Sequence, residues 1–306
     1  MSATRVDAAW GVHDDQIHVS HQQVVALVAD ELPDLAGLDV VAVSGAGTVN
    51  AIYRIGDDVA ARLPLRHADP AEVLIRLRRE TAAAAEFRRA SSVPAPEPLH
   101  IGRPGHGYPM PWTAQSWLAG TTATPTSCEA SATVAHDLNV LIGRLREWDT
   151  GGRRFEGEGR GGELTDHDDW VDECIRRNAD SFDPRAMRKM WADLRRLPRQ
   201  DPDVMCHTDL IPSNLLVDDG QLVGVLDTGG FQPADPALDL VSAWHLLSDE
   251  PRRQLRTSLG CSDLQWDRGR AWAFQQAAGL PWYYRDTNPA MATMGTTTLH
   301  RLLEEQ

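Results

Sequence analysis

The stretch HTDLIPSNLLVDDGQLVGVLDTGG, residues 207–230, concentrates polar side chains in a segment that otherwise has the pattern of a β-hairpin. Short apolar runs flank turn residues at 218–220, and strands joined by such a turn are antiparallel neighbours. Asn214 and Asp227 are therefore predicted at the same end of two adjacent strands. Their oxygens suit Mg²⁺, which takes one or two protein ligands and completes its coordination with phosphates and water.

Asp209 stands five residues before Asn214, close enough along a loop to face the same pocket and to accept a proton from an attacking hydroxyl. The order HxDxxxxN, followed by an Asp at the end of a strand, is that of the protein-kinase catalytic loop and its metal aspartate. Asp, Pro, Ser and Asn also dominate ordinary turns, so the motif alone leaves a purely structural turn open.

The elements before this hairpin predict a small lobe rich in β-structure. Apolar residues at helical spacing in 24–37 indicate a helix, and DVVAVSGAGTVNAIYRIGDDVAARLPL, residues 39–65, has three short runs split by turn residues. A second helix follows at 67–90, and the runs HIG and TAQSWL complete the sheet. In kinase order, this lobe supplies a glycine turn, a cation in Arg62 and a helical acid in Glu80.

From residue 127 onward the pattern is mostly helical, apart from the hairpin. The predicted fold is α+β, with a small antiparallel β-sheet lobe carrying one main helix and a larger, mostly helical lobe carrying a catalytic β-hairpin. The expected boundaries are 1–113 for the nucleotide-binding lobe, 114–120 for a hinge and 121–306 for the catalytic and acceptor-binding lobe.

Composition limits the classes of function. The chain has 306 residues with 30 Lys plus Arg against 44 Asp plus Glu, and the net charge of −14 has the wrong sign for a protein that follows a nucleic-acid backbone. It is compatible with a cationic small molecule, or with acidity that only serves solubility. With no long apolar run and no secretory pattern at the N-terminus, we expect a cytoplasmic protein without a membrane span. The four cysteines lack metal or disulfide spacing and are expected to be buried, reduced thiols.

The chain resembles the aminoglycoside phosphotransferase family, which has a protein-kinase-like two-lobe fold. The matching motifs are CHTDLIPSNLLV, VLDTGGFQPADPALDL, SGAGTVNAIYRIGDDVAARLP and QQAAGLPWYYRDTNP, and together they extend over roughly residues 40–295. The resemblance implies that Asp209 is the catalytic base and that Asn214 and Asp227 hold Mg²⁺.

The resemblance also implies a site for ATP or GTP. Arg62 would neutralise the phosphates, Glu80 would orient Arg62, and the remaining members are the glycine-turn residues Ser44, Gly45, Gly47 and Thr48 and the adenine-stacking hinge residues Gln115, Ser116, Trp117 and Leu118. His207 and Asp239 would be structural, and Asp235 would help to hold the catalytic loop.

Three residues depart from the family pattern. Thr208 replaces the usual Gly between His and Asp, Arg62 replaces the usual strand lysine, and Thr228 replaces the aromatic residue after the metal aspartate. Arg keeps the charge but not the compact ammonium, so its phosphate contacts should differ. The lack of an APE-like segment argues against a protein kinase.

The expected activity is transfer of a γ-phosphoryl group to a hydroxyl of a small molecule, with an aminoglycoside-type antibiotic favoured. A macrolide, another antibiotic or a small metabolite alcohol is an alternative acceptor, and a nucleotide-binding pseudokinase or interaction module is an alternative of a different class. Acceptor contacts are expected from Asp166, Asp168 and Asp169, which could equally cap a helix, and from Trp282, Tyr283 and Tyr284, which favour the core.

Overall fold

The computed structural model describes residues 16–43, 49–157 and 160–304, which form two compact units. The first unit runs to Ala85 and includes Pro96–Leu118, and the second comprises Glu86–Ala95 and the chain from Ala119. The division at Leu118 falls inside the segment 114–120. Residues 86–95 group with the second unit, although the sequence boundary assigns them to the first lobe.

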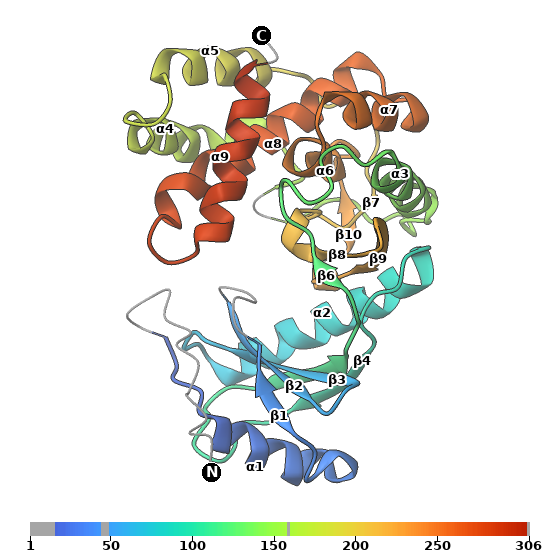
Figure 1. The fold of residues 1–306 in the computed structure, drawn as a ribbon, viewed down its shortest axis with the longest axis vertical. Helices are drawn as coiled ribbons and strands as arrows, with labels where there is room; N and C mark the ends of the chain where they lie inside the picture. Colours follow the sequence, from blue (N-terminus) through green and yellow to red (C-terminus); the bar gives the residue numbers. More distant parts are fainter. Residues whose placement is uncertain (1–15, 44–48, 158–159, 305–306) are drawn as a thin grey trace. The chain divides into compact units, whose positions relative to one another are not determined.

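The first unit is built on a five-stranded antiparallel sheet of order β1-β2-β3-β5-β4 (Figure 1). Its elements are α1 (His21–Glu31), β1 (Val40–Ala42), β2 (Asn50–Ile55), β3 (Val59–Pro64), α2 (Pro70–Ala90), β4 (Pro98–Gly102) and β5 (Trp112–Ser116). The predicted meander and the two completing strands are confirmed. A 3₁₀ turn at Pro33–Leu35 follows α1.

Alternation of side chains explains the core of this unit. In β2, Ala51, Tyr53 and Ile55 are buried at period two, as expected for a sheet with one face on a core. Tyr53 donates its hydroxyl to the Val19 carbonyl oxygen at 2.9 Å, which satisfies the polar end of a buried ring. Val73, in the first turns of α2, joins the same core.

The second unit is mostly helical and carries two small antiparallel sheets, of order β6-β8-β9 and β10-β7. Its helices are α3 (Ala132–Glu147), α4 (Asp168–Arg177), α5 (Pro184–Leu194), α6 (Val241–Leu246), α7 (Asp249–Leu259), α8 (Asp263–Tyr283) and α9 (Pro289–Glu304). Its strands are β6 (Thr121–Thr122), β7 (Val204–Cys206), β8 (Leu215–Asp218), β9 (Gln221–Val225) and β10 (Gln232–Ala234). The short strands β6, β7 and β10 were not predicted.

The predicted hairpin is formed by β8 and β9. Asp219 and Gly220 connect the strands with φ of 45° and 75°, the left-handed pair that a two-residue hairpin turn requires. Leu215 pairs with Val225, and the Leu226 amide donates to the Asn214 carbonyl oxygen at 2.8 Å. The open end of the hairpin therefore presents Asn214 on one side and Asp227 on the other.

Helices α8 and α9 pack closely against each other (Figure 1). A Cβ at Gly295 of α9 would lie 2.6 Å from Leu280 Cβ of α8, so a larger residue there would force the helices apart. Trp244 and Trp272 are fully buried in the core of this unit. No helix in the described ranges is both long and apolar enough to span a membrane.

The four cysteines are free thiols, as predicted. Cys128, Cys174 and Cys206 are buried, and burial raises the pKa of the Cys206 thiol well above its ordinary value. Cys261 is only half-buried, which corrects the expectation that all four are enclosed.

Candidate active site

The loop that begins at His207, which was predicted to be catalytic, is supported by a buried carboxylate. Asp239 is 2% exposed and accepts the His207 amide at 2.8 Å and the Thr208 amide at 2.9 Å, one with each oxygen. Burial raises the pKa of the Asp239 carboxyl above its usual range. The prediction that Asp235 holds this loop is corrected, because the supporting residue is Asp239.

Asp235 has a different set of partners. It is 2% exposed and accepts Nε of Arg268 at 2.9 Å and Nε1 of Trp272 at 2.9 Å, both from α8. The Ala237 amide donates to its other oxygen at 3.0 Å. A buried charge needs this degree of pairing, so Asp235 stabilises the unit rather than the loop.

His207 has a defined tautomer in this loop. Its Nδ1 accepts the Asp209 amide at 3.3 Å, so its Nε2 carries the proton that bonds the Leu226 carbonyl oxygen at 2.9 Å. The ring thereby joins the loop to the residue just before Asp227. Phe87, from the last turn of α2, packs edge-on against this imidazole with centroids 5.6 Å apart.

Thr208 occupies a backbone conformation that favours glycine. Its φ is 73°, in the left-handed region where a branched side chain is strained. The side chain is anchored there, because the Thr208 hydroxyl donates to the Gly230 carbonyl oxygen at 3.2 Å. The departure from Gly at this position is therefore accommodated without moving Asp209 out of the loop.

The Asp209 carboxylate accepts three hydrogen bonds from described residues and is 32% exposed. Oδ1 accepts Nη2 of Arg160 at 3.0 Å and Nε2 of Gln276 at 3.0 Å, and Oδ2 accepts Nδ2 of Asn214 at 3.2 Å. An ionised carboxylate can accept about four such bonds, so Oδ2 has capacity for one further donor. A substrate hydroxyl is the kind of donor that position can take.

Arg160 and Gln276 were not identified from the sequence. Arg160 lies in the Gly- and Arg-rich stretch 151–163, 49 residues before Asp209, and nothing local indicates the pair. Gln276 did carry a signal. It continues the i, i+4 series of Arg268 and Trp272 along one face of α8, so a polar residue on a buried helical face could have been noted.

Asn214 and Asp227 offer oxygen ligands at the open end of the hairpin. The Asn214 amide nitrogen donates to both the Asp209 carbonyl oxygen at 2.9 Å and the Asp209 carboxylate, which leaves its Oδ1 for a cation. Asp227 is exposed and has φ 54°, a left-handed conformation that Asp tolerates better than most residues. One amide and one carboxylate oxygen fit the two-ligand requirement of Mg²⁺, which draws the rest from phosphates and water.

Most of the residues expected to bind nucleotide belong to the first unit. Arg62 lies in β3 between Ile52 of β2 and Thr113 of β5, and its side chain is half-buried. Glu80 lies on α2, 3.6 Å from the Arg76 guanidinium. Ser44, Gly45, Gly47 and Thr48 lie outside the described residues.

Two of the expected hinge residues, Gln115 and Ser116, belong to strand β5. Trp117 follows the strand, and its amide donates to the Asp58 carbonyl oxygen at 2.7 Å. The Arg54 guanidinium lies over the Trp117 ring, 5.1 Å from the centroid. Trp117 and Leu118 are both half-buried. This indole is therefore already covered by one cation.

The acidic group around the start of α4 divides into one engaged and two exposed carboxylates. Asp168 accepts Nε1 of Trp191 at 2.9 Å and Nε of Arg195 at 2.6 Å, and the Arg195 hydrogen bond lowers the pKa of the Asp168 carboxyl. This contact ties α4 to α5. Asp166 and Asp169 are exposed, so they are the members of the group that a cationic ligand could reach.

The aromatic run at the end of α8, residues 282–284, is partly exposed at the surface of the second unit. The Trp282 ring is 5.9 Å from Trp170 and 5.6 Å from Tyr283, and the Arg177 guanidinium lies 5.3 Å from its centroid. Tyr283 is 40% exposed and packs edge-on against Tyr284. The run is therefore neither fully in the core nor free of packing.

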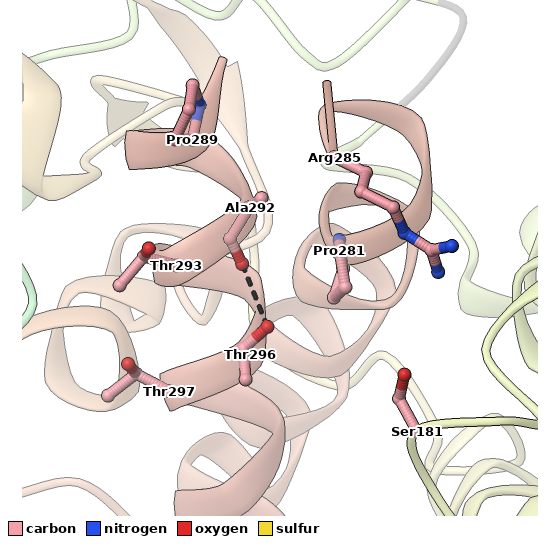
Figure 2. Close-up of a pocket in the computed structure, with 8 residues that line it drawn as sticks. All are labelled: Ser181, Pro281, Arg285, Pro289, Ala292, Thr293, Thr296 and Thr297. Atoms are coloured by element: carbon pink, nitrogen blue, oxygen red, sulfur yellow. Dashed lines mark hydrogen bonds between the residues drawn. The ribbon is translucent and has the colours of Figure 1, made fainter. Parts of the chain in front are cut away.

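A hollow of about 410 Å³ opens beside this run, between the end of α8 and the start of α9 (Figure 2). Figure 2 shows its lining, which consists of Ser181, Pro281, Arg285, Pro289, Ala292, Thr293, Thr296 and Thr297. The described lining provides hydroxyls and a guanidinium but no carboxylate. It therefore offers no counter-charge to a polycation, which would have to come from exposed acids such as Asp166 and Asp169.

Comparison with known proteins gives one family and one fold. The model of the phosphotransferase enzyme family (APH) matches residues 40–272. Among solved structures, the GDP complex of aminoglycoside 2'-phosphotransferase-IIIa aligns with TM-score 0.67 at 16% identity, covering 94% of this chain and 99% of its own. No match is found among curated protein sequences.

Two further structures show the same fold. The GDP and kanamycin complex of APH(2")-IIIa has TM-score 0.65 at 16% identity, with 92% of this chain and 97% of the other covered. The macrolide 2'-phosphotransferase MphH from Brachybacterium faecium has TM-score 0.58 at 18% identity, with 91% and 97% covered. These likenesses confirm the predicted α+β, protein-kinase-like fold.

Proposed function

The chain belongs to the phosphotransferase enzyme family, and we propose from that premise that it transfers the γ-phosphoryl group of ATP or GTP to a hydroxyl of a small molecule. The observation that carries this proposal is the arrangement around Asp209. Three donors fix its carboxylate and Oδ2 retains capacity for a fourth, next to Asn214 and at the end of the hairpin that carries Asp227.

Asp209 acts as the base in this mechanism. The acceptor hydroxyl donates to Oδ2, and its proton passes to Asp209 as the new bond between the acceptor oxygen and the γ-phosphorus forms. The bond from the γ-phosphorus to the bridging oxygen breaks, and the nucleoside diphosphate leaves. Arg160 and Gln276 hold Oδ1, so the carboxylate keeps one orientation through the step.

Asn214 and Asp227 are the residues proposed to hold Mg²⁺, because their oxygens are hard donors at one end of the hairpin. When bound, the ion neutralises charge on the nucleotide phosphates. The Asn214 side chain has a double role, since its nitrogen donates to Asp209 while its oxygen remains for the cation. Base and metal site are thus joined through one side chain.

The first unit is proposed to bind the nucleotide. Arg62 would pair with phosphate oxygens through its planar guanidinium, and Glu80 would orient it. Ser44, Gly45, Gly47 and Thr48 would cover the phosphates, and the strand end Gln115–Leu118 would receive the base. These roles derive from the resemblance and from the strand positions of Arg62 and Gln115.

An aminoglycoside-type acceptor is favoured by the net charge of −14 and by the exposed carboxylates of Asp166 and Asp169. A partly apolar acceptor such as a macrolide is the alternative, which is supported by the exposed rings of Tyr283 and of Trp170, a residue of α4 that packs against Trp282. Similar folds include enzymes named for each acceptor class. Another antibiotic or a small metabolite alcohol is a further alternative acceptor.

The test measures phosphoryl transfer with the full chain and Asp209→Asn. Radiolabelled ATP and GTP with Mg²⁺ are offered to kanamycin, gentamicin and erythromycin, and hydrolysis without acceptor is recorded in parallel. We expect Asp209→Asn to lose turnover by roughly two orders of magnitude or more, because general base catalysis contributes that much. Nucleotide affinity, measured by thermal shift, should stay close to that of the unmodified chain. Normal turnover in Asp209→Asn would refute the assignment.

A chain that binds nucleotide but neither hydrolyses nor transfers its γ-phosphate would instead be a pseudokinase. The departures that motivate this alternative are Thr208 and Arg62. Thr208 is accommodated by its bonds to Asp239 and Gly230, so the loop geometry itself gives no support to loss of activity.

A further inference from the structure

A chain of buried polar side chains leads from Asp209 into the core of the second unit. Nε2 of Gln276 donates to Asp209 Oδ1 at 3.0 Å, Oε1 of Gln276 lies 2.9 Å from His245 Nε2, and His245 Nδ1 lies 2.8 Å from the Thr298 hydroxyl. Gln276 is 7% exposed, and His245 and Thr298 are fully buried. The three residues come from α8, α6 and α9.

Only one arrangement of protons satisfies this chain. A carboxylate accepts and never donates when ionised, so the Gln276 amide nitrogen must face Asp209 and its oxygen must face His245. His245 Nε2 must then carry the proton, which leaves Nδ1 to accept from the Thr298 hydroxyl. Burial lowers the pKa of the His245 imidazole to about 4, with Arg160 and Arg301 adding to the effect, so the ring is neutral near pH 7.

We propose that Gln276, His245 and Thr298 are positioning residues that fix the orientation of the Asp209 carboxylate for proton transfer. An amide can rotate to exchange its nitrogen and oxygen, and the oxygen would repel Asp209 Oδ1. The Asp209 carboxylate requires the Gln276 amide nitrogen, which leaves Gln276 Oε1 to accept from His245 Nε2, and His245 in this tautomer opposes rotation of the amide. The Thr298 hydroxyl holds the imidazole by donating to its Nδ1.

Stability alone does not account for this chain. Buried polar groups are costly unless fully paired, and apolar residues of similar shape often stabilise a core equally well. Each hydrogen bond in this series has one donor and one acceptor. The series ends on the Asp209 carboxylate, which we propose to receive the proton of the substrate hydroxyl. Gln275, the neighbouring amide, shows the contrast, since it is equally buried at 7% but, among the described residues, its amide nitrogen contacts His167 Nδ1 at 3.3 Å and its oxygen has no partner.

The inference rests on the proposed function, because it assigns a task to residues behind the proposed base. It is tested with the slow hydrolysis of ATP or GTP in the presence of Mg²⁺, in which water takes the place of the acceptor hydroxyl. Gln276→Leu is compared with Gln275→Leu, the same change in a neighbouring amide of equal burial. Unfolding temperature and KM for nucleotide are measured for both.

We expect Gln276→Leu to lower kcat by roughly 10- to 100-fold, the range seen when a reacting group is displaced slightly. KM for nucleotide should be unchanged, and Gln275→Leu should keep its kcat. Equal kcat in the two variants, at equal unfolding temperatures, would overturn the inference. If Asp209→Asn keeps full hydrolysis, the proposed function fails instead, so the two failures are distinguishable.

A second comparison keeps the inference open to refutation if Gln276→Leu folds poorly. Thr298→Val removes the hydroxyl and Thr298→Ser restores it, while Thr296→Val removes a hydroxyl of the same helix that bonds only the Ala292 carbonyl oxygen at 3.0 Å. Thr298→Val should lower kcat and Thr298→Ser should recover it, with Thr296→Val unaffected. Equal kcat in Thr298→Val and Thr296→Val would contradict the inference.

Discussion

Helix α8 forms hydrogen bonds to two different aspartates along a single face. Arg268 and Trp272 bond Asp235, and Gln276, the next residue in the i, i+4 series, bonds Asp209. The first partnership is a closed ion pair whose members are both 3% exposed at their side chains. The second is a neutral chain that ends on a carboxylate 32% exposed. One rigid helix thus connects a structural acid to the proposed catalytic one.

The comparison shows how the same residue type serves two purposes in one unit. Asp235 is buried and paired with Arg268, so it is closed to a reactant, and loss of its partner is costly. Asp209 keeps capacity on Oδ2 while its other bonds are directional, so it remains available to a hydroxyl. Substitutions at the Arg268 end should therefore change stability, and substitutions at the Gln276 end should change turnover.

The largest effect is expected from Arg268→Met. Removing one member of a buried ion pair leaves Asp235 charged and unpaired, so the free energy of unfolding should fall by about 3–5 kcal/mol. Chemical denaturation measures this loss. The control is Arg253→Met, which removes an exposed pair with Glu250 and should cost about 0–1 kcal/mol. If kcat in the folded fraction of Arg268→Met falls as much as it does in Gln276→Leu, then Arg268 also affects turnover. That result would contradict the separation of a stabilising and a positioning segment of α8.

The buried His245 imidazole should make the free energy of unfolding of the protein decrease at acid pH. The pKa of His245 is about 4 in the folded chain against 6.5 as its reference, so the unfolded chain binds the proton first as pH falls. The stability that neutral His245 contributes is complete above pH 6.5 and is lost between pH 6.5 and 4. Relative to His245→Gln, the free energy of unfolding should fall by about 2 kcal/mol between pH 7.5 and pH 5. Parallel pH dependence of the two proteins would contradict the assignment of a neutral, buried ring.

An effect smaller than that of Arg268→Met is expected from Trp272→Phe. The change removes one donor from Asp235 but keeps the Arg268 pair, so the loss should be about 1.5–3 kcal/mol, the value of one hydrogen bond to a charged group. Denaturation and kcat are measured together. A loss as large as that of Arg268→Met would show that the indole, and not the guanidinium, is the essential partner of Asp235.

Local patterns were sufficient for much of the architecture. The hairpin, the meander and the long helices follow from side-chain periodicity and turn residues, and the register of β8 with β9 places Asn214 beside Leu226 without any distant information. The strands β7 and β10 have three residues each and pair across an interval of 25 residues, so no local period identifies them. The roles of the individual site residues remain predictions.

Contacts between distant residues were the part that the sequence could not supply. Asp235 and Asp239 are four residues apart and equally buried, and only the packed structure shows which one accepts the His207 and Thr208 amides. Arg160 reaches Asp209 from a segment of low complexity. In each case tertiary packing selects the partner, and the residue type alone is compatible with several.

Residues 208 and 230 cannot change independently of each other. A Cβ at Gly230 would lie 2.8 Å from the Thr208 Oγ1, while its next neighbour, the His207 carbonyl oxygen, would be at an ordinary 3.5 Å. Alanine at 230 would therefore require the Thr208 hydroxyl to move away from its bond to the Gly230 carbonyl oxygen, whereas glycine at 208 would leave room for the added methyl group.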